Sequence, residues 1–160
     1  MPETHKSRLK RILFNYFPAF WSTGAKITYL ADDYKEIHLK LPLNWRTRNY
    51  VGTISGGSMF SATDVLYFLL VLKNLGGDYT VWDNASSIRF KKPGKGNLYA
   101  KAFITDEEIE AIKTELQNTD KIDRVYHLDS IDEAGNIFAS VEKICTHSET
   151  KNNQPRYLNR

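Results

Sequence analysis

A stretch covering residues 49–76 constrains the fold of this chain more than any other part. Two adjacent glycines, Gly56 and Gly57, precede an almost unbroken apolar run at residues 65–72. Glycine has no Cβ, so the backbone N–H groups at this turn can face a ligand closely, and the first N–H groups of a following helix have no acceptor within it. We expect a helix over residues 57–75 that is apolar on nearly every side and must be wrapped by the rest of the chain. The positive end of such a helix suits an anion or an oxyanion.

This helix carries one carboxylate, Asp64, in apolar surroundings. Its neighbours in the sequence include Met59, Phe60, Ala62, Val65, Leu66 and Phe68. A carboxylate buried in such a setting is either held by hydrogen bonds or used in chemistry. The sequence leaves both interpretations open, because Ser61, Thr63 and nearby backbone groups could satisfy Asp64 structurally.

Length and composition indicate one soluble domain without a disulfide. A chain of 160 residues can hold a single core, which we place at residues 1–147, followed by a polar tail at residues 148–160. The single cysteine, Cys145, excludes an intramolecular disulfide, and we expect it to be an inert packed thiol. The N-terminus lacks the apolar core of a secretory signal, and no apolar run reaches the ~20 residues of a membrane span, so we expect a cytoplasmic protein.

The charge pattern does not predict a nucleic-acid partner or a metal site. The formal net charge is only +3, and the basic residues are scattered along the chain. The four histidines, His5, His38, His127 and His147, fall on separate predicted elements without ligand spacing. His38 alternates with charged residues, so we expect it on a solvated strand face.

An amphipathic helix is predicted at the N-terminus, over residues 5–20. Its apolar residues are spaced as on one helix face and end near Pro18: Leu9, Ile12, Leu13, Tyr16, Phe17 and Phe20. Such a basic amphipathic helix could lie on a membrane surface. We favour the alternative, in which it packs on the domain or closes a pocket.

Six β-strands and a second short helix complete the pattern. Strands at residues 25–31 and 34–41 form a first predicted hairpin. A strand at residues 80–92, with a bulge possible at Asp83-Asn84, and another at residues 97–104 form a second, joined by the turn at residues 93–96. Thr105 begins a short surface helix in capping-box form. Strands at residues 121–131 and 137–147 form a third hairpin.

This order of elements predicts an α+β protein. Antiparallel strands on either side of one apolar helix cannot form a doubly wound parallel sheet, which needs a helix in every crossover. A curved antiparallel sheet of about six strands wrapped around the helix buries it most simply.

At this point the chain resembles the hotdog-fold thioesterases of the phenylacetyl-CoA type, over roughly residues 23–146. The resemblance rests on the element order, on Asn49-x-x-Gly52, on Gly56-Gly57 at the start of the helix and on Asp64 seven residues beyond Gly57. The family usually has His-Gly-Gly where this chain has Ser55-Gly56-Gly57. The histidine-free pattern is similar to a poorly characterised bacterial branch of the superfamily that is often labelled tetrameric acyl-CoA thioesterases.

The resemblance implies a hydrolase site in which three of the family's four positions carry over, the histidine being absent. Asn49 would orient water or the carboxylate, Gly56 or Gly57 would polarise the thioester carbonyl, and Asp64 would act as base or nucleophile. Gly57 and Asp64 lie about 10 Å apart along a helix, too far to act on one thioester from the same chain. The family resolves this by dimerisation, so we expect a composite site in a homodimer or a homotetramer built as a dimer of dimers.

Several further residues are candidates for binding coenzyme A. Ser55 could replace the family histidine as a hydrogen-bonding group, and Ser58 lies in the first helical turn. Arg89, Lys91 and Lys92 end a predicted strand and could meet the phosphates. The loop of Trp45 with Arg46 and Arg48 could clamp a phosphate or adenine, or could simply be an exposed loop anchored by one aromatic residue.

Two functions from different classes fit these residues. The first is an acyl-CoA thioesterase that needs no cofactor, coenzyme A being part of the substrate. The second is a non-catalytic protein of the same fold that binds acyl-CoA or a fatty-acyl group. A hotdog dehydratase is disfavoured because no histidine stands near the start of the helix to move a proton.

Overall fold

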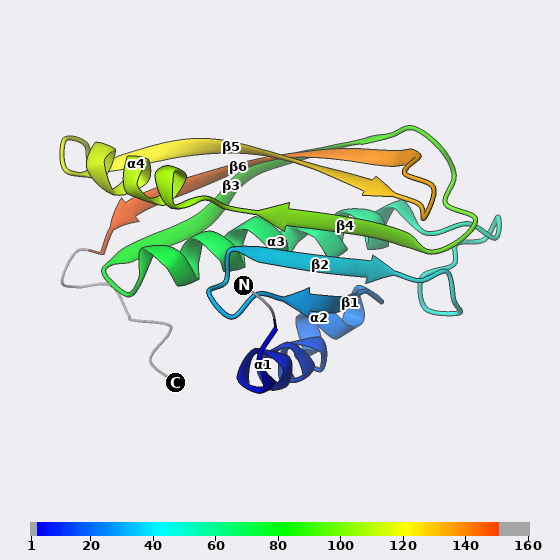
Figure 1. Ribbon diagram of the computed structural model, residues 1–160. Helices are drawn as coiled ribbons and strands as arrows, with labels where there is room; N and C mark the ends of the chain where they lie inside the picture. The colour runs from blue at the N-terminus through cyan, green and yellow to red at the C-terminus, as the bar shows by residue number, and fades with distance from the viewer. Residues whose placement is uncertain (1–2, 151–160) are drawn as a thin grey trace.

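The protein, described here at residues 3–150 of a computed structural model, is a curved six-stranded sheet wrapped around one long helix (Figure 1). The α+β prediction is therefore confirmed. In chain order the elements are α1 (His5–Asn15), α2 (Pro18–Ser22), β1 (Lys26–Leu30), β2 (Glu36–Leu41), α3 (Gly56–Leu75), β3 (Tyr79–Phe90), β4 (Leu98–Phe103), α4 (Asp106–Leu116), β5 (Lys121–Ile131) and β6 (Ile137–Glu149).

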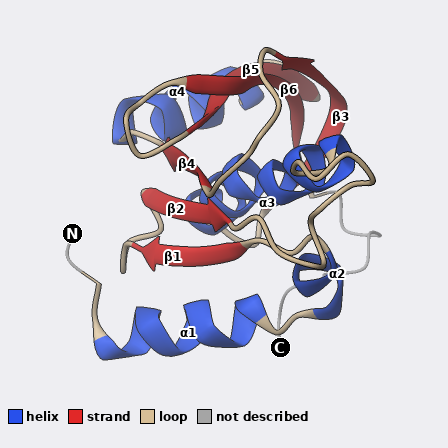
Figure 2. Ribbon diagram, turned by 90° about the vertical axis from the view of Figure 1, so that its right-hand side faces the viewer, coloured by secondary structure: helices blue, strands red, loops and turns tan. Residues whose placement is uncertain are grey.

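The sheet is antiparallel throughout and has the strand order β1-β2-β4-β5-β6-β3. Strands β5 and β6 pair along nearly their whole length, whereas the β4–β5 register is recorded only at Tyr99 and Ile131. The narrow junction lets the sheet bend between its two halves, and the concave face closes over α3 (Figure 2). Strands β1 and β3 are the two edges.

The core lies between α3 and the concave face of the sheet. Leu66, Leu70 and Val71 of α3 are completely buried. On β2, Ile37 and Leu39 are buried while His38 remains partly exposed on the other face, as the alternation predicts. Helix α3 is long and apolar enough to span a membrane, but the sheet covers it, which makes it a core helix.

Two of the three predicted hairpins are confirmed. Strands β1 and β2 pair, as do β5 and β6, and the predicted bulge appears as a register shift between Asp83 and Ala85. The second predicted hairpin is wrong, because β3 pairs with β6 and β4 pairs with β2 and β5. The turn predicted at residues 93–96 is replaced by an irregular connection, which passes the start of α3 and carries the chain from one half of the sheet to the other.

The N-terminal helix differs from its predicted form in two respects. It is broken, since α1 ends at Asn15 and α2 begins at Pro18, which lacks the N–H needed to continue the ladder. It does pack on the domain, beside β1, with Phe20 buried and Phe14 half-buried against the core, but its other large apolar residues face away from the sheet. At the other end, β6 continues through Ser148 and Glu149, and the rest of the predicted tail, residues 151–160, lies outside the described residues.

Candidate active site

The site centres on the N-terminus of α3, which two neighbouring loops hold in place. Ser55 is the N-cap residue, and its N–H donates to the carbonyl of Thr47 at 2.7 Å, but its side chain makes no cap bond. The N–H of Ile54 donates to the carbonyl of Gly94 at 2.8 Å. The first-turn N–H groups of α3 have no acceptor within the helix. They therefore present the positive end of a 20-residue helix at this point.

Gly56 is needed for close packing rather than for an unusual backbone angle. A Cβ at this position would lie 2.9 Å from Cζ of Phe90 at the end of β3. At Gly57 a Cβ would meet nothing closer than the Ser55 hydroxyl, 3.7 Å away. Gly57 is exposed, so it is the glycine whose missing side chain leaves space for a ligand.

A cavity of about 370 Å³ opens beside this helix end. It is lined by Ile54, Gly56, Met59, Phe90, Lys91, Lys92, Pro93 and Gly94. Apolar side chains thus meet the start of α3 and two lysines in one hollow. Gly56 is far in sequence from Lys91 and Lys92, and the sequence analysis predicted that all three serve one site. In the structure they line the same cavity.

Arg89 lies in a different hollow. That hollow, about 730 Å³ in volume, is formed by β3, β5 and β6, and Arg89 and Lys91 line it together with His127 and Glu142. Lys91 lines both hollows. A phosphate-binding group that includes Arg89, Lys91 and Lys92 would therefore extend from the end of β3 into the segment that follows it, rather than converge on one point.

The side chain of Asn49 closes its own loop. Its Nδ2 donates to the Thr53 hydroxyl at 2.9 Å, and its Oδ1 accepts from the Thr53 N–H at 3.0 Å. The loop between them includes Gly52, whose φ of 84° lies in the left-handed region. Asn49 thereby shapes the segment that leads into α3, and in this arrangement its amide is not directed at Asp64.

The two arginines of this loop have separate environments. The Arg46 guanidinium stacks on the ring of Trp21, with its central carbon 3.9 Å from the ring centroid, and not on the adjacent Trp45. Trp45 is 84% exposed, so it does not anchor the loop within this chain. Arg48 is also exposed and pairs through its backbone with Ile54.

Asp64 is not the buried carboxylate that its neighbours suggested. Its side chain is 65% exposed, because α3 turns one side away from the sheet. Its Oδ1 lies 3.0 Å from the ammonium of Lys143, which also donates to the Asp64 carbonyl. The buried charge at this place is Lys143, whose side chain is only 1% exposed.

Lys143 joins two carboxylates from different elements. Its ammonium lies 2.6 Å from Oδ2 of Asp83, at the bulge of β3, and the thiol of Cys145 donates to Oδ1 of the same residue at 3.1 Å. Burial and the neighbouring Asp83 carboxylate raise the pKa of the Cys145 thiol, so it remains protonated. The network therefore ties α3 to the bulge of β3 and the centre of β6.

Sequence reasoning missed this network, although it left a trace in the pattern. The inward-facing positions of β6 run Val141, Lys143, Cys145, so one lysine interrupts an apolar alternation. A buried lysine requires a paired carboxylate. That requirement could have directed attention to the polar residues at the β3 bulge.

The exposed positions of α3 follow one helical line. Gly57, Ser61 and Asp64 are exposed, at spacings of four and three residues, and Phe68 continues the line as a half-buried residue. The glycine turn and the carboxylate therefore share one accessible side of α3, about 10 Å apart. Within residues 3–150, no three His, Cys, Asp or Glu side chains are grouped as they would be around a metal ion.

The comparisons with known proteins agree with this architecture. A protein from Pseudomonas aeruginosa, described as of unknown function and a probable thioesterase, superposes with a TM-score of 0.81 at 22% identity, covering 94% of this chain and 99% of that one. A thioesterase from Haemophilus influenzae gives a TM-score of 0.69 at 13% identity, covering 96% and 97%. The PaaI protein of the E. coli phenylacetic acid degradation operon gives 0.60 at 14% identity, covering 90% and 92%.

These similarities and the wrapped helix show that the protein has the hotdog fold, as the sequence resemblance indicated. Residues 5–145 match the family described as domain of unknown function (DUF4442). The chain belongs to that family. No protein of curated function matches it significantly.

Proposed function

We propose that this protein is a hydrolase of acyl-CoA thioesters, with each active site formed by two subunits. The observation that carries the proposal is the placing of Asp64 on the accessible side of α3, in line with the exposed Gly57. A carboxylate and a set of free N–H groups are the two components that thioester hydrolysis needs. The thioesterase descriptions of structures with the same fold support this choice.

The start of α3 would stabilise the developing oxyanion. The N–H groups of Gly57 and Ser58 lie at the positive end of the helix, and removing one such donor typically costs about 3 kcal/mol of barrier. The adjacent cavity offers Ile54, Met59 and Phe90 to the apolar part of the acyl group. Lys91 and Lys92 at its rim would meet coenzyme A phosphates.

Asp64 would act as the base that activates water, or attack the thioester directly. Lys143 would serve as its positioning residue, because a buried ammonium on a strand fixes one carboxylate oxygen at 3.0 Å. The remaining carboxylate surface is exposed and free to meet a substrate. Asn49 would support the site by shaping the loop that leads into α3.

A second subunit would bring the two components together. Strand β3 is a 12-residue sheet edge that pairs with β6 on one side only, and Trp82 and Phe90 on it are exposed. Long exposed edges of this kind are templates for pairing with another chain. A dimer joined there would set the Asp64 of one subunit against the helix start of the other.

Release of free thiol from a panel of acyl-CoAs, measured for wild type and Asp64→Asn, tests the proposal. General base catalysis contributes about 10²–10⁴-fold, so we expect Asp64→Asn to lower kcat by at least about 100-fold. Asp106→Asn is the matched control, since Asp106 is also exposed and paired with a lysine, Lys35, at 2.5 Å. Hydrolysis that is unchanged in Asp64→Asn would refute the catalytic role.

Subunit complementation tests the composite site. Asp64→Asn and Gly57→Val chains are each expected to be inactive, and co-expression should restore activity in mixed dimers that retain one intact site. Failure of every mixed dimer to turn over substrate, with both chains folded and paired, would argue for sites within single chains.

The alternative is a non-catalytic acyl-CoA-binding protein. The ion pair of Asp64 with buried Lys143 favours this reading, because it gives the carboxylate a structural purpose. Ser55, at the position where the thioesterases that the sequence resembles usually have histidine, points the same way. Tight binding of acyl-CoA without thiol release, equal in wild type and Asp64→Asn, would identify this function.

A further inference from the structure

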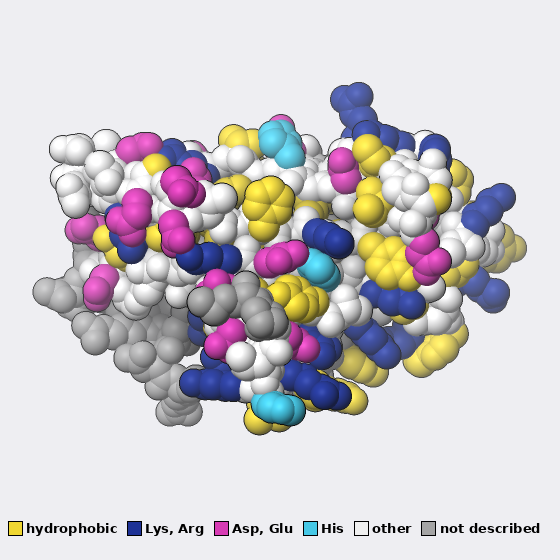
Figure 3. Space-filling model, in the orientation of Figure 1, with side chains coloured by type: hydrophobic (Ala, Val, Ile, Leu, Met, Phe, Trp, Pro, Cys, Tyr) yellow, Lys and Arg dark blue, Asp and Glu magenta, His cyan; other side chains and the backbone are white. Residues whose placement is uncertain are grey.

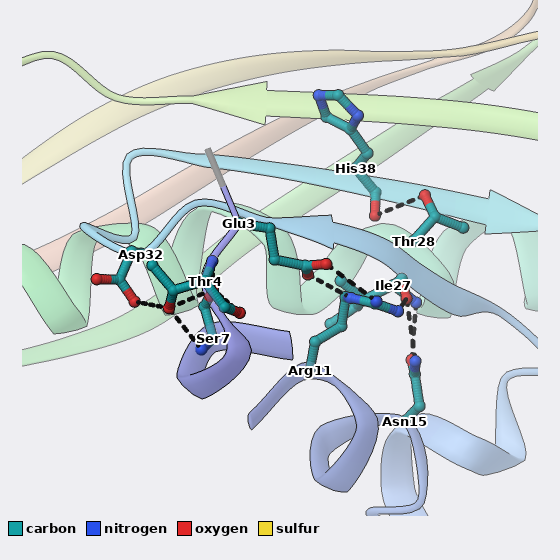
Figure 4. Close-up of polar contacts among 9 residues, drawn as sticks. All are labelled: Glu3, Thr4, Ser7, Arg11, Asn15, Ile27, Thr28, Asp32 and His38. Carbon is teal, nitrogen blue, oxygen red and sulfur yellow. Dashed lines mark hydrogen bonds and ion pairs between the residues drawn. The ribbon is translucent and has the colours of Figure 1, made fainter. Parts of the chain in front are cut away.

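Helix α1 attaches to the domain mainly through polar side chains, beside one half-buried apolar residue, Phe14, that packs against Phe20. The Asn15 side chain accepts from the N–H of Ile27 at 2.7 Å and donates to the carbonyl of the same residue at 3.0 Å. Arg11 donates to that carbonyl at 3.3 Å, and the buried Ser7 completes the cap with Thr4 (Figure 4). Since β1 is an edge strand, these side chains satisfy backbone groups that no further strand reaches.

The opposite side of α1 is apolar and faces solvent. Large apolar side chains of α1, of the two residues that link it to α2, and of α2 are exposed to the following extents: Leu9 58%, Ile12 39%, Leu13 64%, Tyr16 73%, Phe17 58% and Trp21 49%. Their spacing makes them one stripe rather than scattered contacts. A helix that only covered a sheet would turn this stripe inward, so the observed orientation marks an interaction surface.

The charge around the stripe limits what can cover it. From His5 to Ala31 the chain has five basic residues, Lys6, Arg8, Lys10, Arg11 and Lys26, and no acidic residue. Arg11 is paired with Glu3, while Lys6, Arg8, Lys10 and Lys26 are exposed. In the space-filling view, Lys and Arg side chains border the lower edge of the molecule where hydrophobic side chains emerge (Figure 3).

A second copy of this chain is a poor occupant. A two-fold interface places the same patch against itself, so these cations would face one another. Like charges brought together across an interface oppose association. The partner must therefore combine an apolar interior with negative charge at its surface.

An anionic membrane has this combination. Interfacial helices bury Leu and Phe at the boundary of headgroups and acyl chains, with Lys and Arg meeting anionic headgroups. Tyr16 and Trp21, at the far end of the stripe, are the residue types that favour the membrane–water interface. We propose that α1 and α2 form a docking surface for membranes containing anionic lipids, with Leu9, Leu13 and Phe17 entering the apolar boundary.

Sedimentation with vesicles tests this surface on the full chain. Wild type should bind vesicles of phosphatidylcholine with phosphatidylglycerol, and added salt or pure phosphatidylcholine should weaken binding. We expect Leu13→Ser/Phe17→Ser and Lys6→Glu/Arg8→Glu each to reduce binding by at least about tenfold. The control is Phe103→Ser, which removes an apolar residue of similar exposure, 66%, from β4.

The altered side chains are exposed, so circular dichroism and thermal unfolding should show that all variants retain the fold. Equal vesicle binding by wild type and both double variants would overturn the proposal. So would binding that ignores lipid charge. A change in oligomeric state by sedimentation velocity in Leu13→Ser/Phe17→Ser, without any vesicle binding by wild type, would instead assign the surface to a protein contact.

Discussion

His147 makes the stability of this protein sensitive to mild acid. It lies on β6 with none of its surface exposed, and neither ring nitrogen has a hydrogen-bond partner among residues 3–150. Burial lowers the pKa of His147 from 6.5 to about 4, with a smaller contribution from Arg124 that outweighs the opposing effect of Asp123. The folded protein therefore holds this imidazole neutral at pH values where the unfolded chain would protonate it.

The sign and size of the effect follow from proton linkage. Between pH 6.5 and about 4 the unfolded state binds more protons at this site, so the free energy of unfolding decreases as the pH falls. The difference of 6.5 − 4 = 2.5 pKa units, at 1.36 kcal/mol per unit, limits the loss to slightly above 3 kcal/mol, most of it reached by about pH 4. Above about pH 7.5, where both states hold the imidazole neutral, the site contributes almost no pH dependence.

Urea unfolding of wild type and His147→Phe, from about pH 7.5 to about pH 4, measures this contribution. Other titrating groups largely cancel in the difference, so wild type should lose about 3 kcal/mol more than the variant over this range. His127→Phe is the control for a histidine-to-phenylalanine replacement outside the core, because His127 is 72% exposed. Parallel curves for wild type and His147→Phe would refute the reasoning.

Two further predictions concern the site. Lys143→Met should destabilise the protein by about 3 kcal/mol, because Asp83, only 23% exposed, loses its cation. Adding Asp83→Asn should recover part of this loss. An unaltered urea midpoint in Lys143→Met alone would contradict the role of the Lys143–Asp83 pair. Gly56→Ala should cost about 1 kcal/mol, the low end for overpacking, because its Cβ would lie 2.9 Å from the ring tip of Phe90, which is 53% exposed and can shift. Gly57→Ala should be nearly neutral, and thermal unfolding that ranks the two variants in the opposite order would disprove this packing.

Local patterns predicted most elements but not their partners. The alternation in β2 and the apolar character of α3 were sufficient to place both, because each reflects burial along a single segment. The glycines and proline of residues 93–96 predict a turn, yet the structure has an irregular connection there that joins strands in different halves of the sheet. Turn residues specify a reversal of the chain, whereas strand pairing depends on how the sheet wraps α3.

In the N-terminal helix, too, local spacing predicted the element, whereas contacts with the rest of the fold decided its orientation. The spacing of Leu9, Leu13 and Phe17 correctly predicts an apolar stripe, and Pro18 correctly marks where the first helix cannot continue. Which side would face the sheet could not be read from spacing. The edge-facing backbone groups of Ile27 on β1 decided which side of α1 faces the sheet. The Asn15 side chain accepts from the N–H of Ile27 and donates to its carbonyl, so the polar side of the helix must lie against the strand.

The sequence by itself determined the wrapped helix, the glycine turn at its start and the position of Asp64 two turns further along. Those features are local, and they carry the resemblance to the hotdog thioesterases. Only the tertiary structure decided that Asp64 faces outward, that Lys143 is the buried charge and that Lys91 and Lys92 border the helix start. Each of these depends on contacts between segments far apart in the chain, where the bend of the sheet and the bulge of β3 set which side chains meet.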